Sequence, residues 1–323
     1  MASGGASAAD GSMVSPATRT VTVRVPATSA NLGPGFDTLG LALGFYDELV
    51  VSTRPEPGAT VEVIGEGAAG SAAPVSTDAS NLVVQSIAHA YKYAGVPMPG
   101  LNLRAHNQIP HSRGMGSSSA AIVSGLMAAK GLLEGQFDFT EQDLLALATE
   151  LEGHPDNVAP ALFGGLTIAW TTDEGPRCKK LLVHRGVSPL VLVPSFTMST
   201  KLARSLQPEN VPHEDAIFNV SRSSLLVAAL TQSPELLFES TEDKLHQDYR
   251  AEAMPQTSTL IKALRDAGFA AVVSGAGPSI LVLCSDPAQR LAAAKVVEAA
   301  QETPWRALML AVDFSGATVE VAS

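Results

Sequence analysis

Cysteine and long apolar runs are both scarce in this chain of 323 residues. Its two cysteines, Cys178 and Cys284, stand far apart in unrelated contexts, which excludes a disulfide framework and a cysteine-based structural zinc site. No apolar run approaches the ~20 residues of a transmembrane helix, and the first twenty residues lack the apolar core of a secretory signal. We therefore expect a reduced, cytoplasmic protein with no membrane partner.

Positive charge is also in short supply. The chain has 21 basic and 32 acidic residues, for a formal net charge of −11. A nucleic acid or an anionic membrane would require a basic face, so we expect neither as a partner. If the ligand is an anion, a few well-placed groups must hold it, because the overall field repels it.

Helix and strand patterns are mixed along the chain without strict alternation, which predicts an α+β fold. Residues 1–19 are rich in alanine, serine and glycine and are predicted to be a disordered tail. Alternating strands are predicted from residue 20, and a helix over 81–95 with Asp78 and Ser80 as cap candidates. A second helix is predicted over 140–153, capped by Thr140 and stopped by Gly153. No metal-binding spacing links five histidines that we expect on the surface or in loops: His106, His111, His184, His213 and His246.

The stretch PHSRGMGSSSAA, residues 110–121, predicts an anion-binding loop. Gly114 and Gly116 permit a tight backbone turn, and three serines follow at the start of an apolar helix, where free amides and the helix dipole attract anions. A plain glycine turn with a serine cap explains the loop nearly as well. The loop matches neither a P-loop nor a nucleophile elbow, and the GAGPS segment between two predicted strands does not fit a Rossmann fingerprint.

Two further stretches, PATSANLGPGFDTLGLAL (26–43) and SGAGPSILVL (274–283), join GMGSSSAA in a set that resembles the signature motifs of the GHMP kinases. The resemblance spans Val21 to about Val321, with Met115 where the family usually has leucine. It implies a two-domain fold. An N-terminal domain like ribosomal protein S5 domain 2 would cover residues 20–165, and a ferredoxin-like C-terminal domain would cover 166–323. The active site would lie in the cleft between them. Many members are dimers, so the resemblance also implies a homodimer.

The resemblance implies ATP as phosphoryl donor and Mg²⁺ as its cation. Ser118 and Glu150 would hold the metal. Glu152 lies on another face of the same predicted helix, so only one of the two glutamates can readily reach it. A solvated carboxylate explains Glu150 almost as well. Asn81 is assigned to the nucleotide pocket, with a helix-cap role as its alternative. The family's phosphate cradle falls on Pro110, Arg113, Gly114, Met115, Gly116, Ser117, Ser118, Ser119 and Ala120.

Within the family, SANLGPGFD and EGHPDNVAPALFGG resemble the branch that phosphorylates L-homoserine. In that resemblance Arg204 and Arg250 clamp the substrate carboxylate, and Asn31 and Asp37 hold its amino-acid end. Solvated arginines and ordinary turn residues are the plainer alternatives. The acceptor hydroxyl would be lined by His154, Asp156 and Asn157, with Asp156, Asn157 and Ser118 as the catalytic group.

Three alternatives remain open at this stage. Asp156 is assigned to orienting the hydroxyl, while its role as a general base is left open, because a loose phosphoryl-transfer transition state needs little early proton removal. The acceptor could be another small alcohol, such as mevalonate or shikimate. The chain could also be a silent sensor that binds ATP and a metabolite, although that class would be expected to lose the serines or acidic residues present here.

Overall fold

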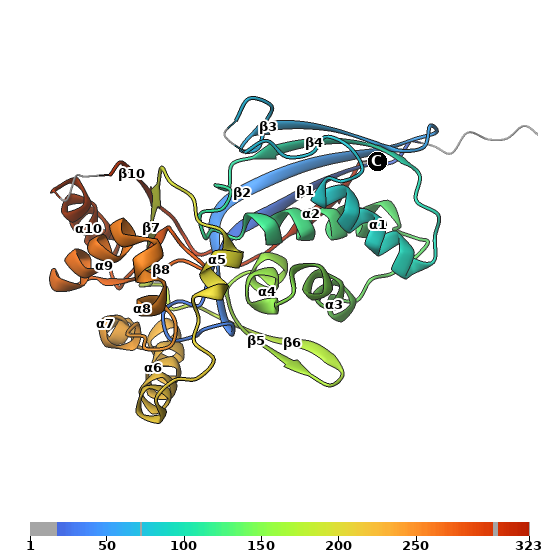
Figure 1. Ribbon diagram of the computed structural model, residues 1–323. Helices are drawn as coiled ribbons and strands as arrows, with labels where there is room; N and C mark the ends of the chain where they lie inside the picture. The colour runs from blue at the N-terminus through green and yellow to red at the C-terminus, as the bar shows by residue number, and fades with distance from the viewer. Residues whose placement is uncertain (1–17, 72, 300–302, 323) are drawn as a thin grey trace, which may run out of the picture.

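The computed structural model describes residues 18–71, 73–299 and 303–322 (Figure 1), so the predicted tail over 1–19 lies outside the described residues apart from its last two positions. Within these ranges no helix has the length and apolarity that crossing a membrane requires. The described chain forms two sheets with helices packed against each, and the predicted α+β class is confirmed.

The first sheet has seven strands. Its main path runs in the order β11-β1-β2-β4-β3, with β5 paired to β2 and β6 paired to β5. Pairing is antiparallel except between β3 and β4. The strands are β1 (Thr20–Ala30), β2 (Leu39–Arg54), β3 (Ala59–Gly65), β4 (Gly100–Asn107), β5 (Leu166–Thr172), β6 (Gly175–Leu181) and β11 (Thr318–Val321).

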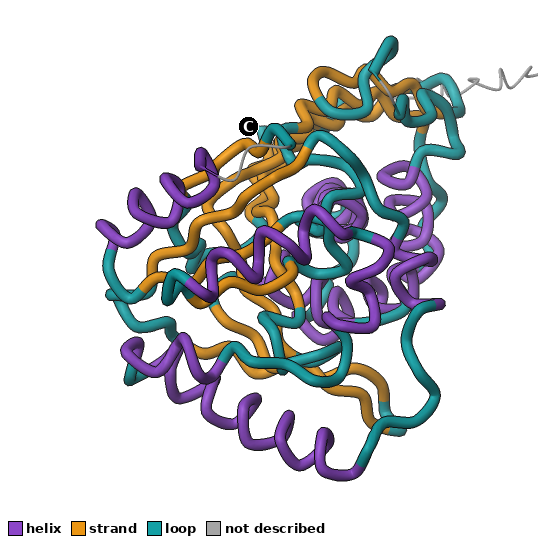
Figure 2. The backbone as a smooth tube through the Cα atoms, turned by 60° about the vertical axis from the view of Figure 1, so that its left-hand side comes forward, coloured by secondary structure: helices purple, strands orange, loops and turns teal. Residues whose placement is uncertain are grey.

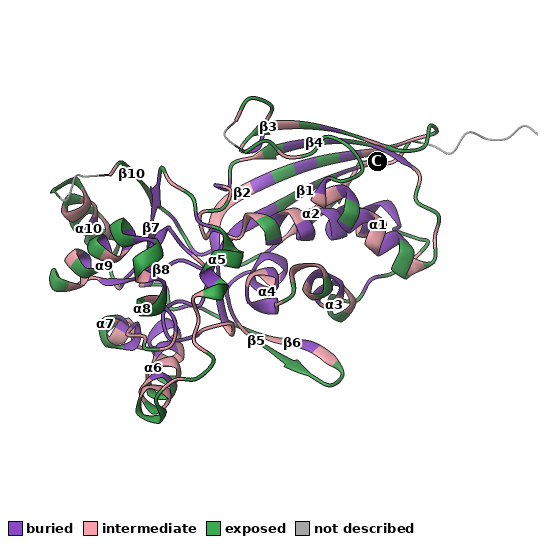
Figure 3. Cartoon of the chain, viewed as in Figure 1, coloured by how far each residue is buried: buried purple, intermediate pink, exposed green. Residues whose placement is uncertain are grey.

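Four helices cover one side of this sheet (Figure 1): α1 (Leu82–Ala94), α2 (Ser117–Leu132), α3 (Glu141–Glu152) and α4 (Pro155–Phe163). Helix α2 is buried over most of its surface, since it packs against β1 on one side and α1 on the other. Helix α4 is likewise mostly buried (Figure 3). Because these two helices are surrounded by packed side chains, the groups at their N-termini are held on a rigid base.

The second sheet has four antiparallel strands in the order β10-β7-β9-β8. With β7 counted first this order is 4-1-3-2, the ferredoxin-like arrangement that was predicted. The strands are β7 (Ser188–Pro194), β8 (Ala270–Val273), β9 (Ile280–Cys284) and β10 (Trp305–Met309). The helices of this half are α5 (Thr200–Ser205), α6 (His213–Thr231), α7 (Leu237–Ser240), α8 (Gln247–Arg250), α9 (Pro255–Asp266) and α10 (Pro287–Ala299), with short 3₁₀ turns at Pro234–Leu236 and Ala251–Ala253.

The predicted domain boundary after Gly165 cuts through the first sheet. Strand β5 begins at Leu166 and pairs with β2, and β6 pairs with β5, so the first half continues to Leu181. Strand β11 then returns from the second half to pair with β1. Figure 2 shows the strands of the chain in orange with the helices in purple beside them. The extent of the first sheet depends on strand partners that are far apart in the sequence, and the residues around Gly165 do not indicate which strands they pair with.

Most predicted helix ends are confirmed. Thr140 caps α3 with a capping box, and Gly153 ends it in the left-handed region. Helix α1 begins one residue later than the predicted caps suggested. Its cap is Asn81, whose side chain accepts from the Val83 amide at 2.9 Å. Asp78 and Ser80 bond to each other one turn upstream.

Candidate active site

The three motif segments meet where the two halves of the chain touch. The Thr28 amide in β1 donates to the Met115 carbonyl at 3.1 Å. The side chain of Asn31 donates to the Gly275 carbonyl at 2.9 Å. The Ser274 hydroxyl donates to the Gly114 carbonyl at 2.6 Å. Segments that lie far apart in the sequence therefore form one site.

Both glycines of the 110–121 loop are required by close backbone approach. Gly114 and Gly116 have φ of 72° and 70°, in the left-handed region. A Cβ on Gly114 would lie 2.1 Å from the Ser274 carbonyl oxygen, and one on Gly116 would lie 2.0 Å from the Thr28 hydroxyl. The loop thus turns directly into α2, and its serine amides precede the first intrahelical bond, from the Ala120 amide to the Gly116 carbonyl. The predicted anion-binding geometry is present.

The acidic residue beside this helix end is Glu152. The hydroxyls of Ser118 and Ser119 each donate to its carboxylate at 2.8 Å. Glu150 instead lies 2.9 Å from His89 Nε2, with 63% of its side chain exposed. Residues two positions apart on a helix lie about 200° apart around its axis. Of the two glutamates, Glu152 is the one that faces α2. The expectation that Glu150 accompanies Ser118 is therefore corrected to Glu152.

A cavity lies between the serine turn and the second half of the chain. Twelve residues singled out from the sequence line it, Glu152 among them as the alternative to Glu150. They are Asn31, Asp37, Gly114, Gly116, Ser117, Ser118, Glu152, His154, Asp156, Asn157, Arg204 and Arg250. Further lining comes from Ser112, Met198, Thr200, Gly275, Ala276 and Gly277.

Opposite charges face each other across one end of this cavity. Arg204, near the end of α5, holds Asp37 through two parallel contacts of 3.2 Å, each between one guanidinium nitrogen and one carboxylate oxygen. Both side chains are about 40% exposed to solvent, at 41% and 39%. Arg250, at the end of α8, is buried beside them. An exposed pair of this kind contributes little stability and is available to exchange partners with a charged ligand.

The α3–α4 junction supplies further polar groups to the cavity. His154 Nδ1 contacts the buried Asp156 carboxylate, and this hydrogen bond raises the pKa of His154 against the lowering effect of burial. The Thr28 hydroxyl donates to Asn157 Oδ1 at 2.9 Å, so the amide nitrogen of Asn157 stays available as a donor. Burial on α4 fixes the Asp156 side chain, and the bond from Thr28 holds Asn157.

A second, more apolar groove opens beside the first cavity. Its walls include side chains of β3, β4 and α1, and it shares Ser112, Ser117 and Ser118 with the polar cavity. Asn81 lines it and also caps α1, so both roles considered for this residue have a structural basis. A flat apolar groove joined to a polar cavity at a helix N-terminus suits a purine nucleotide whose phosphates point toward a second, polar substrate.

Five residues assigned to the phosphate cradle lie outside both cavities. Met115, Ser119 and Ala120 are fully buried beneath the loop. Pro110 and Arg113 line a separate depression beside β7, where the Arg113 guanidinium donates to the carbonyls of Pro194 and Ser195. Arg113 therefore ties the loop to the second half of the chain, and the side chains of these five residues line neither cavity.

Asp47, in β2 at the floor of the groove, predicts a pH dependence of stability. Its Oδ1 accepts from the amides of Gln108 and Ile109, and burial raises its pKa from 3.8 to about 6 against those two bonds. The folded chain then binds this proton more tightly than the unfolded chain. The contribution of Asp47 to the free energy of unfolding is therefore full below pH 3.8 and is lost as the pH rises through about 6.

Asp47→Asn keeps the acceptor oxygen and removes this titration. We expect the wild type to gain about 1.4 kcal/mol in unfolding free energy relative to the variant when the pH is lowered from 8 to 5, the equivalent of one pKa unit. Urea unfolding of both proteins at the two pH values measures this difference. A difference that does not change with pH would show that Asp47 is ionised at both.

Sequence reasoning missed the burial of His246, which was expected on the surface or in a loop and lies in the bend before α8. Its side chain is fully buried, and its Nε2 lies 2.8 Å from the Gly33 carbonyl oxygen. A single histidine in a polar segment offered no signal of this, because the segment that covers it is more than 200 residues away in sequence.

Comparison with known proteins gives one consistent result. The family models described as the GHMP kinases N-terminal domain and C-terminal domain match residues 81–165 and 225–302. The homoserine kinase of Leifsonia xyli subsp. xyli is 72% identical over 303 residues, covering 93% of this chain and 92% of its own length. The homoserine kinase of Clavibacter michiganensis subsp. michiganensis is 68% identical over 303 residues, covering 94% and 95%.

Solved structures agree with these sequences. The crystal structure of homoserine kinase from Cytophaga hutchinsonii has a TM-score of 0.81 at 29% identity, covering 93% of this chain and 97% of that one. A mevalonate kinase from L. major in complex with R-mevalonate has a TM-score of 0.65 at 16% identity, covering 90% and 96%, and shows a common fold only.

Proposed function

This chain belongs to the GHMP kinase family, and from that premise we propose that it is a homoserine kinase. The reaction transfers the γ-phosphoryl group of ATP to the hydroxyl oxygen of L-homoserine, giving O-phospho-L-homoserine on the route to threonine. The observation that carries the proposal is the meeting of the apolar groove and the polar cavity at Ser117 and Ser118, which brings a nucleotide and a small zwitterion to one helix N-terminus.

The charges of the cavity complement those of an amino acid. A substrate that inserts between Asp37 and Arg204 replaces their ion pair with two new ones, ammonium to Asp37 and carboxylate to Arg204. Arg250 adds a second guanidinium for the carboxylate. The side-chain oxygen of Asn31 accepts from the Asp37 backbone amide at 2.9 Å and so orients the loop that carries Asp37. Because Asp37 and Arg204 pair with each other when no substrate is bound, neither charge is left without a partner.

The phosphates of ATP fit the start of α2. Free amides at Ser117–Ser119, the helix dipole and the absence of an acidic residue in the first turn all favour an anion there. The Ser118 hydroxyl and the Glu152 carboxylate form a hard-oxygen donor pair that suits Mg²⁺, which takes one or two protein oxygens and completes its shell with phosphates and water. When bound, this cation would neutralise charge on the transferring phosphoryl group.

At the reacting centre we assign Asn157 and Asp156 to orienting the acceptor hydroxyl. Asn157 has a free amide donor, and the Asp156 carboxylate is held by His154. In a loose transition state the attacking oxygen carries little developing charge, so positioning and electrostatic stabilisation supply most of the acceleration. General-base action by Asp156 is not required by this assignment.

The proposal is tested by ADP release in a coupled assay with Mg²⁺-ATP. Separate reactions contain L-homoserine, mevalonate, shikimate or no acceptor. We expect turnover that depends on L-homoserine. Greater turnover with mevalonate or shikimate would move the acceptor assignment within the same fold. ATP binding without turnover on any acceptor would favour a sensor.

A further inference from the structure

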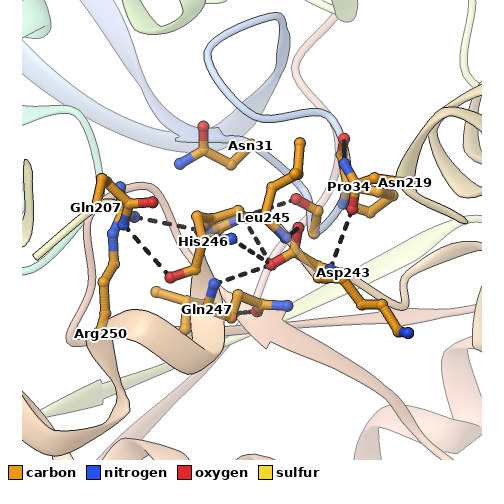
Figure 4. A network of polar contacts seen from close by, with 12 residues as sticks. Asn31, Pro34, Gln207, Asn219, Asp243, Leu245, His246, Gln247 and Arg250 are labelled. Carbon is orange, nitrogen blue, oxygen red and sulfur yellow. Dashed lines mark hydrogen bonds and ion pairs between the residues drawn. The ribbon is translucent and has the colours of Figure 1, made fainter. Parts of the chain in front are cut away.

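A buried polar network lies directly behind Arg250 and is not accounted for by substrate contacts (Figure 4). At its centre is His246, the residue before α8, with no exposed surface. Its ring stacks on Phe36 with a centroid distance of 4.9 Å and an interplanar angle of 18°. The network thus joins the second half of the chain to the loop that carries Asn31 and Asp37.

The two ring nitrogens of His246 have partners of opposite character. Nε2 lies 2.8 Å from the Gly33 carbonyl oxygen, which can only accept a hydrogen bond, so Nε2 must carry a proton. Nδ1 lies 3.3 Å from Arg250 Nη1, which can only donate, so Nδ1 must be unprotonated. The geometry therefore specifies the neutral Nε2–H tautomer.

Asp243 offers the competing arrangement, a protonated histidine beside a buried carboxylate. Its nearest oxygen is 3.6 Å from His246 Nε2, beyond hydrogen-bond reach. The carboxylate is already engaged by three backbone amides, those of Leu245 at 3.0 Å, His246 at 3.1 Å and Gln247 at 2.9 Å. Burial and the Arg250 cation lower the pKa of His246, against the opposite effects of Asp243 and Asp37, which agrees with a neutral ring.

Three acceptors fix the Arg250 guanidinium from behind. Nη1 contacts His246 Nδ1 and the Gly275 carbonyl, each at 3.3 Å. In the amide orientation that satisfies both of its neighbours, Gln207 accepts from Nε at 2.8 Å and donates to the Leu245 carbonyl at 3.1 Å. Within the described ranges no hydrogen bond uses Nη2, and Arg250 lines the polar cavity. The side that is not held is thus the side available to a ligand.

We propose that His246 is a positioning residue for homoserine binding: as the neutral Nε2–H tautomer it aims the Arg250 guanidinium into the cavity and ties it to the Gly33–Phe36 turn. The inference rests on the proposed function, because it assigns Arg250 to the substrate carboxylate. A ring that accepts from Arg250 and donates to Gly33 sets the distance between the carboxylate clamp and the ammonium site at Asp37. His246 itself touches no substrate, since it does not line the cavity.

Two conservative variants separate the two ring contacts. Asparagine places an amide oxygen near the position of Nδ1, so His246→Asn keeps an acceptor for Arg250 and loses the Gly33 bond. Glutamine places an amide nitrogen near the position of Nε2, so His246→Gln keeps the Gly33 bond and loses the acceptor. His246→Leu removes both. His89→Asn, at the exposed contact with Glu150 in the first half of the chain, is the matched control for replacing a histidine far from this network.

We expect His246→Leu and His246→Gln to raise the homoserine KM about 30-fold, the equivalent of one hydrogen bond to a charged group, while the ATP KM changes less than about twofold. His246→Asn should have a homoserine KM close to the wild-type value. Circular dichroism and melting temperature report whether each variant folds. A long-range ¹H–¹⁵N spectrum of the wild type should show a neutral histidine with the proton on Nε2, and this signal should be absent from the His246 variants and present in His89→Asn.

The outcomes are distinguishable. If the wild type releases no ADP with L-homoserine, the proposed function fails and this inference fails with it. If the wild type turns over and folded His246→Leu keeps the wild-type homoserine KM, only the inference is overturned. Equal increases in both KM values, or a doubly protonated ring in the spectrum, would also overturn it.

Discussion

Replacing Glu152 by glutamine is expected to lower kcat at least about 100-fold, whereas the same replacement at Glu150 leaves kcat within about twofold. Glu152 accepts from both Ser118 and Ser119 at the start of α2, and its charge is the acidic partner for a cation on the phosphates. Glutamine keeps the size of the side chain and removes that charge. Steady-state ADP release at saturating ATP and L-homoserine measures the effect.

The dependence on Mg²⁺ separates loss of the cation from general damage. For Glu152→Gln the Mg²⁺ concentration that gives half-maximal activity should rise, and for Glu150→Gln it should stay at the wild-type value. Glu150 is a fair control because it lies two residues away on the same helix, exposed beside His89. A large loss in Glu150→Gln with wild-type behaviour in Glu152→Gln would restore the original assignment to Glu150.

Arg250→Leu is expected to raise the homoserine KM at least about 100-fold and to change the ATP KM less than about threefold, since a buried guanidinium lost from a carboxylate costs several kcal/mol. Arg250 lines the polar cavity and is absent from the apolar groove. The two substrates should therefore respond separately. Initial rates with each substrate varied in turn measure the two constants.

Arg222→Leu is the matched control, because its guanidinium contacts Glu242 and lies in neither cavity. It should leave both KM values unchanged. Arg250→Lys keeps the charge but not the fork that meets Gln207 and His246, so we expect an intermediate homoserine KM. Equal damage to both substrates in Arg250→Leu would indicate a folding defect or a misplaced clamp.

Local chemistry made much of this molecule readable from its sequence. Thr140 and Gly153 delimit α3 because a capping box and a left-handed stop act within one or two turns of the chain. The serine turn follows from Gly114 and Gly116 in the same way, since both adopt the left-handed backbone region that glycine enters without strain. The family motifs also predicted a phosphate cradle, and the resemblance predicted that Asn31, Asp37, Arg204 and Arg250 share one site.

Other properties depended on residues that only the folded chain brings together. The resemblance assigned the metal to Glu150, whereas the packing of α3 against α2 places Glu152 beside Ser118. The first half runs past Gly165 because β5 finds its partner in β2, more than 100 residues earlier. His246 lies in a loop, as expected, but contacts with the Gly33 carbonyl and the Phe36 ring bury it. Helix caps and turns are determined by residues that are neighbours along the chain. The face that a helix presents, the pairing of strands and the burial of a side chain are determined by residues that are far apart in the sequence and meet only in the folded chain.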